Sequence, residues 1–365
     1  MRSALLPRHA RACARSFAMS ALQPCAAAPA AAALEAAAQP RRVAYFDADF
    51  VHDEAAAIRD LPAAAASPLA AAAEEAAASS ARCWQRFFAR HRAGFFHARS
   101  FVLEAFPALE GLVGAGGRLL EVGAGSGSNV AGLLERLPGM RAVYACDVAP
   151  AALRAVRGHP RVQEEERNGR LRLFLWDVAT GACPVSPPGL RVGGRGGECG
   201  GGGGGGGGSG GISEGGSGSD SGGSRAAELN ALHATFLPTP PEVAAGGQLD
   251  AALLTFVASA LHPRDHARAF SNAAATLRPG GRLFFRDYGV GDVAATRLEP
   301  LGARLYRRGD GTLSYAFALE EVRLHMEAAG LVNIELKHAC VANRNRKTGV
   351  ELRRVFVSGS GARRG

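Results

Sequence analysis

A glycine-rich turn between a short apolar segment and a helical pattern limits most strongly what this chain can fold into. The turn reads Glu121-Val-Gly-Ala-Gly-Ser-Gly127; residues 118–122 form the apolar segment, and residues 129–137 carry the helical pattern. Glycines at such a turn let the backbone approach a ligand closely and leave amide groups that point at it. We therefore expect a ligand-binding loop at the carboxyl end of a β-strand.

Strand-like and helix-like segments alternate through the rest of the chain. Further strands are predicted at 142–146, 171–176, 249–257 and 282–286, with helices at 150–157, 262–277 and 319–329. This alternation is typical of an α/β fold with a doubly wound, mostly parallel sheet. Two final strands, 333–343 and 350–358, flank a basic turn and predict an antiparallel edge strand.

Acidic residues follow three of the predicted strands. Glu121 precedes the first glycine by two positions, and Asp147 and Asp177 end the second and third strands. Ligands bind at the carboxyl edge of open α/β sheets, so the three acids would share one site. The dinucleotide fingerprint G-x-G-x-x-G fails at Ser128. An acid followed by G-x-G-x-G is instead the S-adenosylmethionine loop of class I methyltransferases. The alternative is that each acid only caps a turn.

Two segments have a biased composition. Residues 1–40 are rich in Ala, Pro and Arg and contain no acid before Glu35, which predicts either an organelle transit peptide or a disordered leader. Localisation is therefore predicted as cytoplasmic, or as mitochondrial or chloroplast if the leader is a transit peptide. Residues 184–247 include nine consecutive glycines, Gly200–Gly208, and predict a disordered insertion. A disordered tail is predicted at 359–365.

Residues 41–110 are predicted to form an N-terminal helical extension, and its second half combines aromatic residues with arginines. Arg82, Arg86 and Arg90 are four residues apart and would share a helix face, and no acid occurs between Arg82 and Arg99. The net charge of +9 favours polyanionic partners. Taken alone, the arginines are explained better by a solvated helix face.

The predicted fifth strand ends in Phe285-Arg-Asp-Tyr-Gly289, where a buried Arg and Asp must either pair or contact a ligand. In the first reading Arg286 pairs with Asp287 and Tyr288 packs. In the second, these side chains face a substrate. The seven cysteines are scattered without a C-x-x-C pair, so we expect neither a disulfide framework nor a metal site. No apolar run is long enough to cross a membrane, so we expect no membrane span.

Several motifs resemble the tRNA N3-methylcytidine methyltransferases, a branch of the methyltransferase-like proteins. They are Cys83-Trp-Gln-Arg-Phe-Phe88, Phe95-Phe-His-Ala-Arg99, Tyr144-Ala-Cys-Asp147, Phe256-Val-Ala-Ser-Ala-Leu-His-Pro263, Phe285-Arg-Asp-Tyr-Gly289, Arg308-Gly-Asp-Gly-Thr-Leu-Ser-Tyr315 and Arg354-Val-Phe-Val357. The resemblance runs from about Cys83 to Val357, outside the glycine-rich insertion. It implies a class I methyltransferase domain with a Rossmann-like sheet, placed at 111–358, after the N-terminal extension.

The resemblance implies an enzyme that uses S-adenosylmethionine to form N3-methylcytidine in the anticodon arm of tRNA. The implied cofactor-binding residues are Trp84, Phe88, Glu121, Gly123, Gly125, Gly127, Asp147, Asp177, Val178 and Thr255; the implied catalytic residues are Arg286, Asp287 and Tyr288. The implied RNA-binding residues are Arg82, Arg86, Arg90, Arg99, Arg308, Tyr315, Arg344, Arg346 and Lys347.

Three positions depart from the family pattern. Phe88 stands where Tyr is usual, Thr255 where an apolar residue is usual, and Ser128 is one extra residue in the loop. An aminoacyl-tRNA synthetase or another auxiliary protein is a further partner that the resemblance allows. Two alternatives stay open: a class I methyltransferase that acts on a protein or small molecule, and a non-catalytic RNA-binding protein.

Overall fold

The computed structural model of the chain describes residues 47–61, 67–91, 101–180, 249–344, 349 and 351–365. The predicted leader and the predicted glycine-rich insertion lie outside these residues, and so do Arg99, Arg346 and Lys347. All described residues belong to one unit, Tyr45–Gly365.

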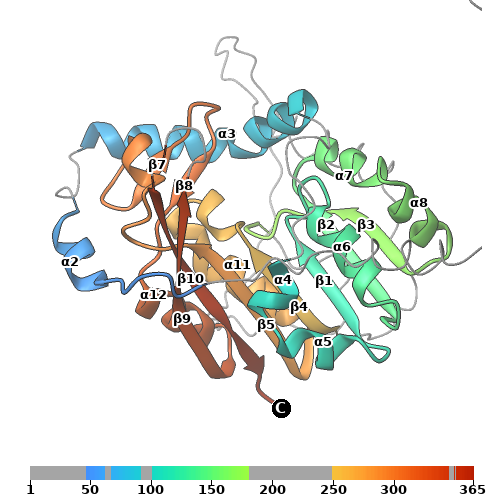
Figure 1. Cartoon of the computed structure of the whole chain (residues 1–365). Coiled ribbons are helices and arrows are strands. Elements are labelled where there is room, and N and C mark those ends of the chain that lie inside the picture. Colours follow the sequence, from blue (N-terminus) through green and yellow to red (C-terminus); the bar gives the residue numbers. More distant parts are fainter. Residues whose placement is uncertain (1–46, 62–66, 92–100, 181–248, 345–348, 350) are drawn as a thin grey trace, which may run out of the picture. The chain divides into compact units, whose positions relative to one another are not determined.

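Seven strands form the main sheet (Figure 1). They are β1 (Arg118–Val122), β2 (Ala142–Asp147), β3 (Leu171–Leu175), β4 (Leu249–Thr255), β5 (Leu277–Tyr288), β9 (Leu331–Arg344) and β10 (Glu351–Arg363). Their order in the sheet is β3-β2-β1-β4-β5-β10-β9. The first five pair parallel with one another, whereas β10 is antiparallel to both β5 and β9. The doubly wound, mostly parallel sheet is thus confirmed. The final two strands pair antiparallel at one edge of the sheet, as predicted, with β10 between β5 and the edge strand β9.

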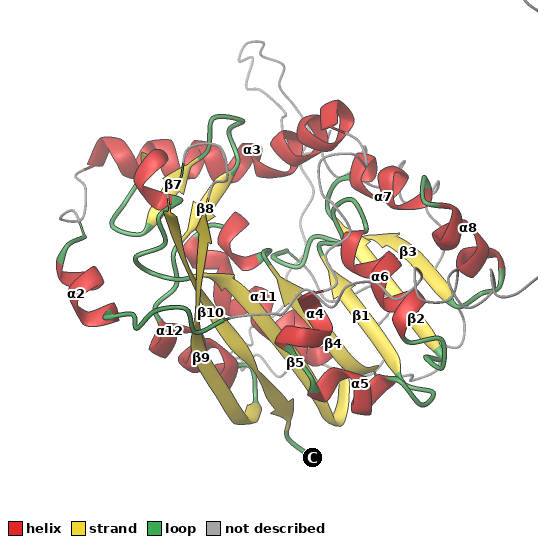
Figure 2. Ribbon diagram, viewed as in Figure 1, coloured by secondary structure: helices red, strands yellow, loops and turns green. Residues whose placement is uncertain are grey.

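Helices cover both faces of this sheet (Figure 2). They are α4 (Phe101–Ala105), α5 (Ala108–Val113), α6 (Ser128–Arg136), α7 (Pro150–Arg157), α8 (Pro160–Arg167), α11 (Pro263–Ala275) and α12 (Leu319–Ala328). Successive residues of β1 point to opposite faces: Leu119 packs in the core that α5 and α6 cover, and Leu120 in the core that α11 and α12 cover. Burial on both faces explains the continuous apolar run Ala251–Leu254 in the central strand β4.

The chain adds further elements before and after β5. They are α2 (Glu54–Arg59), α3 (Ser67–His91), η2 (Ala258–Ala260), η3 (Ala295–Arg297), and a small sheet of β6 (Glu299–Pro300), β7 (Leu305–Arg307) and β8 (Leu313–Tyr315). The helix α3 contacts β8 near one end of the fold and α7 near the other (Figure 1). None of the described helices has the length and apolar character needed to span a membrane.

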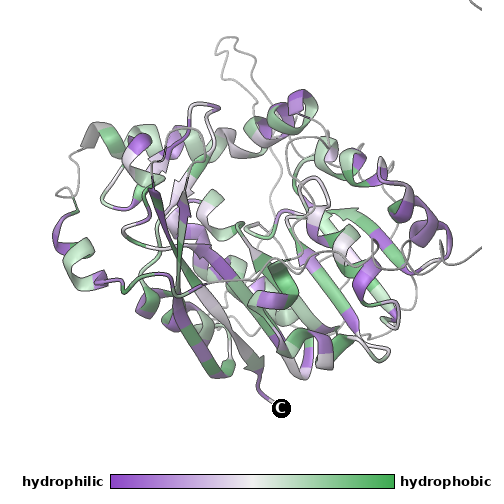
Figure 3. Cartoon of the chain, viewed as in Figure 1, coloured by the Kyte–Doolittle hydropathy of each residue, from purple (hydrophilic) through white to green (hydrophobic). Residues whose placement is uncertain are grey.

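The structure departs from the predicted elements at three places. The helix α8 was not predicted because its sequence is largely charged and only Val162 and Glu165 are buried (Figure 3). The strands β6 to β8 have two or three residues each, too few for a periodic pattern. The prediction of a disordered tail at 359–365 is wrong for most of its length, because β10 continues to Arg363 and pairs with β5 and β9.

Candidate active site

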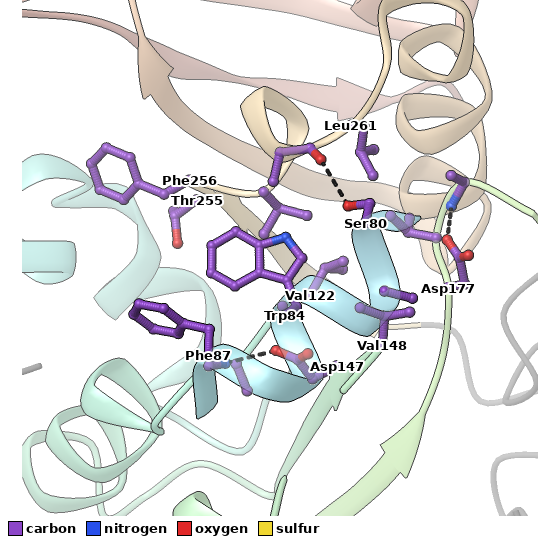
Figure 4. Close-up of a pocket in the computed structure, with 18 of the residues that line it drawn as sticks. Ser80, Trp84, Phe87, Val122, Asp147, Val148, Asp177, Thr255, Phe256 and Leu261 are labelled. Carbon is purple, nitrogen blue, oxygen red and sulfur yellow. Dashed lines mark hydrogen bonds between the residues drawn. The ribbon is translucent and has the colours of Figure 1, made fainter. Parts of the chain in front are cut away.

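A cavity of about 690 Å³ lies at the carboxyl ends of β1, β2, β3 and β4 (Figure 4). Glu121, Asp147 and Asp177 all line it, and Trp84 of α3 lines it from outside the sheet. The structure therefore brings together the three acids that the sequence places at successive strand ends. Figure 4 places Asp177 and Phe256 on opposite sides of Trp84, so the cavity extends past the indole ring in two directions.

The glycine loop connects β1 to α6, and Gly123 and Gly125 line the cavity. Gly123 has φ +69°, and a Cβ atom built there would lie 2.4 Å from Cγ2 of Val257. A larger residue would therefore both strain the backbone and push the loop out of place. Gly127 also has a positive φ, as the N-cap of α6, but it does not line the cavity. Its part is to turn the chain into the helix.

Asp147 joins the glycine loop to the end of β2. Its Oδ2 atom accepts a hydrogen bond of 2.9 Å from the amide of Gly125, and Oδ1 accepts one of 2.9 Å from the amide of Ala149. Burial raises the pKa of Asp147 to about 6, and the amide hydrogen bonds act against this shift. Each carboxylate oxygen has two lone pairs, so the side chain can accept further hydrogen bonds from a ligand.

Glu121 is only 2% exposed, and its pKa is shifted further from the usual value than that of Asp147. Its Oε1 atom accepts a hydrogen bond of 2.9 Å from Nδ2 of Asn129, whereas Oε2 has no hydrogen-bond partner among the described residues. Burial raises its pKa to about 8, the Asn129 hydrogen bond lowers it, and the charge of Asp147 raises it further. A buried carboxyl group with a spare oxygen suits a cationic ligand group. The sequence analysis missed Asn129, although it noted the extra residue just before it.

Trp84 and Phe88 of α3 form an aromatic wall beside the glycine loop. The ring of Trp84 stacks on that of Phe88 with centroids 5.8 Å apart, and Phe88 approaches the position where Gly125 lacks a side chain. The amide of Ala151 in α7 donates a hydrogen bond of 2.8 Å to Oε1 of Gln85. Glu74 forms an ion pair with Arg264 at the start of α11. Contacts at both ends therefore fix α3 across the cavity.

The end of β3 and the end of β4 complete this part of the site. The amide of Ala179 donates to Oδ1 of Asp177 at 3.0 Å, and the carbonyl of Val178 accepts from Nδ2 of Asn272 at 2.7 Å. Thr255 lines the cavity beside Asn129, whose amide lies 3.5 Å from its hydroxyl oxygen. The unusual threonine thus extends the hydrogen bonds around Glu121.

The other part of the cavity is aromatic. Phe256 has φ +58°, a strained conformation for a side chain of this size, and this places its ring near those of Phe101, Tyr288 and Phe356. The centroid distances from Phe256 are 6.1 Å to Phe101, 5.4 Å to Tyr288 and 5.6 Å to Phe356. All four residues line the cavity. Among these, the sequence analysis assigned a site role only to Tyr288.

Two arginines flank the Tyr288 ring and also line the cavity. The guanidinium carbon of Arg354 lies 5.5 Å from the ring centroid and that of Arg308 lies 5.7 Å from it. Arg354 is held by Asp292, whose Oδ2 atom lies 2.9 Å from its Nε, and Nη2 of Arg308 donates to Oγ of Ser314 at 3.0 Å. Two fixed positive charges therefore border the aromatic part of the cavity.

Asp287 and Arg286 do not line the cavity, which corrects the expectation that they face a substrate. Asp287 is fully buried, and its two oxygens accept hydrogen bonds of 2.9 Å from the amides of Ser259 and Tyr288. Burial raises its pKa to about 6. The guanidinium carbon of Arg286 lies 4.6 Å from the Phe356 ring centroid. Asp287 and Arg286 therefore contact Tyr288 and Phe356, two residues that line the cavity.

The predicted RNA-binding residues fall into separate groups. Arg308 lines the cavity, whereas the exposed Arg82, Arg86 and Arg90 follow one face of α3 outside it. Tyr315, which the resemblance implies as an RNA-binding residue, is buried outside the cavity, and its hydroxyl donates to Glu321. Arg344 ends β9, and its side chain lies outside the described part of the structure.

The chain is similar to several known proteins. A family model described as a methyltransferase domain matches residues 88–336. The tRNA N(3)-methylcytidine methyltransferase trm141 of Schizosaccharomyces pombe is 26% identical over 287 residues, which cover 77% of this chain and 91% of that protein. The tRNA N(3)-cytidine methyltransferase METTL6 of Rattus norvegicus is 28% identical over 280 residues, 75% of this chain and 76% of that protein. Among solved structures, a 1,6-didemethyltoxoflavin-N1-methyltransferase of Burkholderia thailandensis is 16% identical, with a TM-score of 0.45, over 79% of this chain and 91% of that one.

Proposed function

The chain belongs to the methyltransferase-domain family, and from that premise we propose that it transfers the methyl group of S-adenosylmethionine to N3 of a cytidine in the anticodon arm of tRNA. The proposal rests on one observation. A single cavity has an acidic part, which the glycine loop also lines, and an aromatic part, which two arginines also line. The relatives named as tRNA N(3)-methylcytidine methyltransferases support this choice of substrate.

The acidic part fits the methyl donor. The donor carries an ammonium group and a sulfonium group, and the buried Oε2 atom of Glu121 has no hydrogen-bond partner among the described residues. Asp147 has lone pairs left for ribose hydroxyls, and Asp177, which lines the same cavity, would accept a hydrogen bond from the adenine amino group. The rings of Trp84 and Phe88 would shield the bound donor from water on one side. When bound, S-adenosylmethionine supplies a methyl group that its sulfonium charge already activates.

The aromatic part fits a nucleobase. Cytosine N3 has a free lone pair at neutral pH, so the site needs no strong base and must mainly hold N3 in line with the methyl group. Positioning of this kind can contribute roughly 7–11 kcal/mol to lowering the barrier. N3 lies on the Watson–Crick edge, so the base must be unpaired or flipped out of its helix. Phe256 and Tyr288 offer ring faces for stacking, and such faces also stabilise the cationic product base.

The arginines fit the RNA backbone. Arg308 and Arg354 border the aromatic part and would contact the phosphates next to the flipped nucleotide. Arg82, Arg86 and Arg90 are exposed on α3, and they would extend this contact along the RNA. Binding that depends on such contacts weakens steeply as salt rises. A requirement for an aminoacyl-tRNA synthetase or other auxiliary protein remains a prediction.

Transfer of a radiolabelled methyl group tests the substrate class. The purified chain is incubated with labelled S-adenosylmethionine and either unfractionated tRNA, tRNA-depleted protein extract or a metabolite extract. We expect label in tRNA for the wild type and none for Asp147→Ala. Label in protein or in metabolites but not in tRNA would contradict the proposed substrate. If calorimetry detected no binding of S-adenosylmethionine, the proposed activity itself would be wrong.

A further inference from the structure

Three potential metal ligands meet between α11 and α12, outside the cavity. His266 belongs to α11, whereas Glu321 and His325 are four residues apart on α12 and so lie on one face of that helix. One ligand atom from each residue lies within 4.8 Å of the other two. None of the three lines the cavity, and the proposed methyl transfer uses none of them.

His266 is fully buried, and neither of its ring nitrogens has a hydrogen-bond partner among the described residues. A buried polar group without a partner destabilises the fold, so its place in the core needs an explanation. Imidazole is the commonest metal-ligating side chain, and either of its ring nitrogens can bind an ion.

Glu321 supplies a fixed negative charge to the same point. Arg304 contacts Oε2, which leaves Oε1 facing Nε2 of His325 at 3.8 Å. The Tyr315 hydroxyl lies 2.9 Å from Oε1. Arg304 thus orients the carboxylate, and its charge reduces the affinity for a dication.

We propose that His266, Glu321 and His325 bind a divalent transition-metal ion that joins α11 to α12. Two imidazole nitrogens and one carboxylate oxygen match Zn²⁺ best, with a water molecule in the fourth position of a tetrahedral site. An ion bound only by the folded chain stabilises the fold. The sequence analysis expected no metal site because it considered cysteine spacing, whereas these ligands come from two helices separated by β5 and the small sheet.

The test uses the full chain prepared without a histidine tag. Its zinc content is measured by mass spectrometry, and the chelator-treated protein is then titrated with Co²⁺, whose visible absorption reports tetrahedral nitrogen and oxygen ligands. We expect one ion per chain for the wild type and for the control His159→Ala, which removes an exposed histidine. The variants His325→Ala and Glu321→Gln should bind Co²⁺ at least about tenfold more weakly.

Circular dichroism of each variant separates loss of a ligand from loss of the fold. Glu321→Gln preserves the size of the side chain and provides the test if His325→Ala does not fold. Chelation should lower the melting temperature of the wild type and leave that of a folded variant unchanged. The proposal is overturned if the wild type binds neither ion stoichiometrically, or if a folded His325→Ala or Glu321→Gln binds Co²⁺ as tightly as the wild type.

Discussion

The Oδ2 atom of Asp147 accepts a 2.9 Å hydrogen bond from the backbone amide of Gly125, so the acid that ends β2 holds the loop that follows β1. The same carboxylate lines the cavity in which we place the methyl donor. One residue therefore links the shape of the glycine loop to ligand binding. Its loss should affect both.

We predict that Asp147→Ala weakens S-adenosylmethionine binding by about 10- to 100-fold. Hydrogen bonds to a charged group contribute roughly 1.5–3 kcal/mol, and a tenfold change in affinity corresponds to about 1.4 kcal/mol. Isothermal titration calorimetry measures the change. Glu164→Ala serves as the control, because it removes an acid from the exposed surface of α8. Equal affinities for Asp147→Ala and the control would contradict the assigned role.

Two glycines offer a matched test of the loop. Gly123→Ala places a Cβ at φ +69° and close to Val257, so it should destabilise the fold by about 1–3 kcal/mol and weaken cofactor binding. Gly132→Ala lies within α6, where a Cβ meets nothing within 4 Å, and should stabilise by about 0.5–1 kcal/mol. Urea denaturation gives both values. If Gly123→Ala left the free energy of unfolding unchanged, the loop would not be tightly constrained.

The contribution of Glu121 to stability should fall as pH rises. The folded chain raises the pKa of Glu121 from 4.5 to about 8, so the folded state keeps a proton that the unfolded state releases. This stability is fully present below pH 4.5 and is lost as the pH increases to about 8, with a slope of at most about 1.4 kcal/mol per pH unit. Asp147 and Asp287 contribute in the same direction from about pH 4 to about 6.

Glu121→Gln provides the comparison for this pH dependence. We expect its free energy of unfolding, measured in urea between pH 6 and pH 8, to vary less than that of the wild type. Over this range the glutamine has no proton to lose, whereas Glu121 has a folded-state pKa of about 8. If the free energy of unfolding depended on pH equally in the two proteins, the pKa of Glu121 would not be raised by folding.

Asp287→Asn should act through the position of Tyr288. Both oxygens of Asp287 accept backbone amide hydrogens, and an amide NH₂ group in place of one oxygen would face a donor. We predict a loss of about 1–3 kcal/mol in stability, a lower kcat and an unchanged cofactor affinity. Tyr288→Ala should lower kcat/KM for tRNA without the loss of stability. If Asp287→Asn kept full turnover, the positioning role would be wrong.

The sequence predicts the fold well where a local signal and the sheet agree. Residues 118–122 and 150–157 match β1 and α7, because the glycine turn marks the end of the first and Pro150 marks the start of the second. The order of the last two strands could not be predicted, because no local signal tells whether β10 or β9 pairs with β5. That choice depends on long-range packing.

The residues of the candidate site could also be predicted only in part. The three acids could be predicted, because each follows a strand and the ends of parallel strands meet at one edge. Phe101 and Phe356 could not, because α4 and β10 come together only in the folded sheet. Asp287 was misassigned because a strand-end acid has the same sequence whether it faces a ligand or binds two backbone amides.

The most direct test of the account is the identity of the methylated nucleoside. The chain is incubated with S-adenosylmethionine that carries a deuterated methyl group and with total tRNA, and the tRNA is then digested and its nucleosides are measured by mass spectrometry. The account predicts deuterated 3-methylcytidine with the wild type and none with Asp147→Ala. Deuterium in other nucleosides only, or in no nucleoside although the chain binds S-adenosylmethionine, would contradict it.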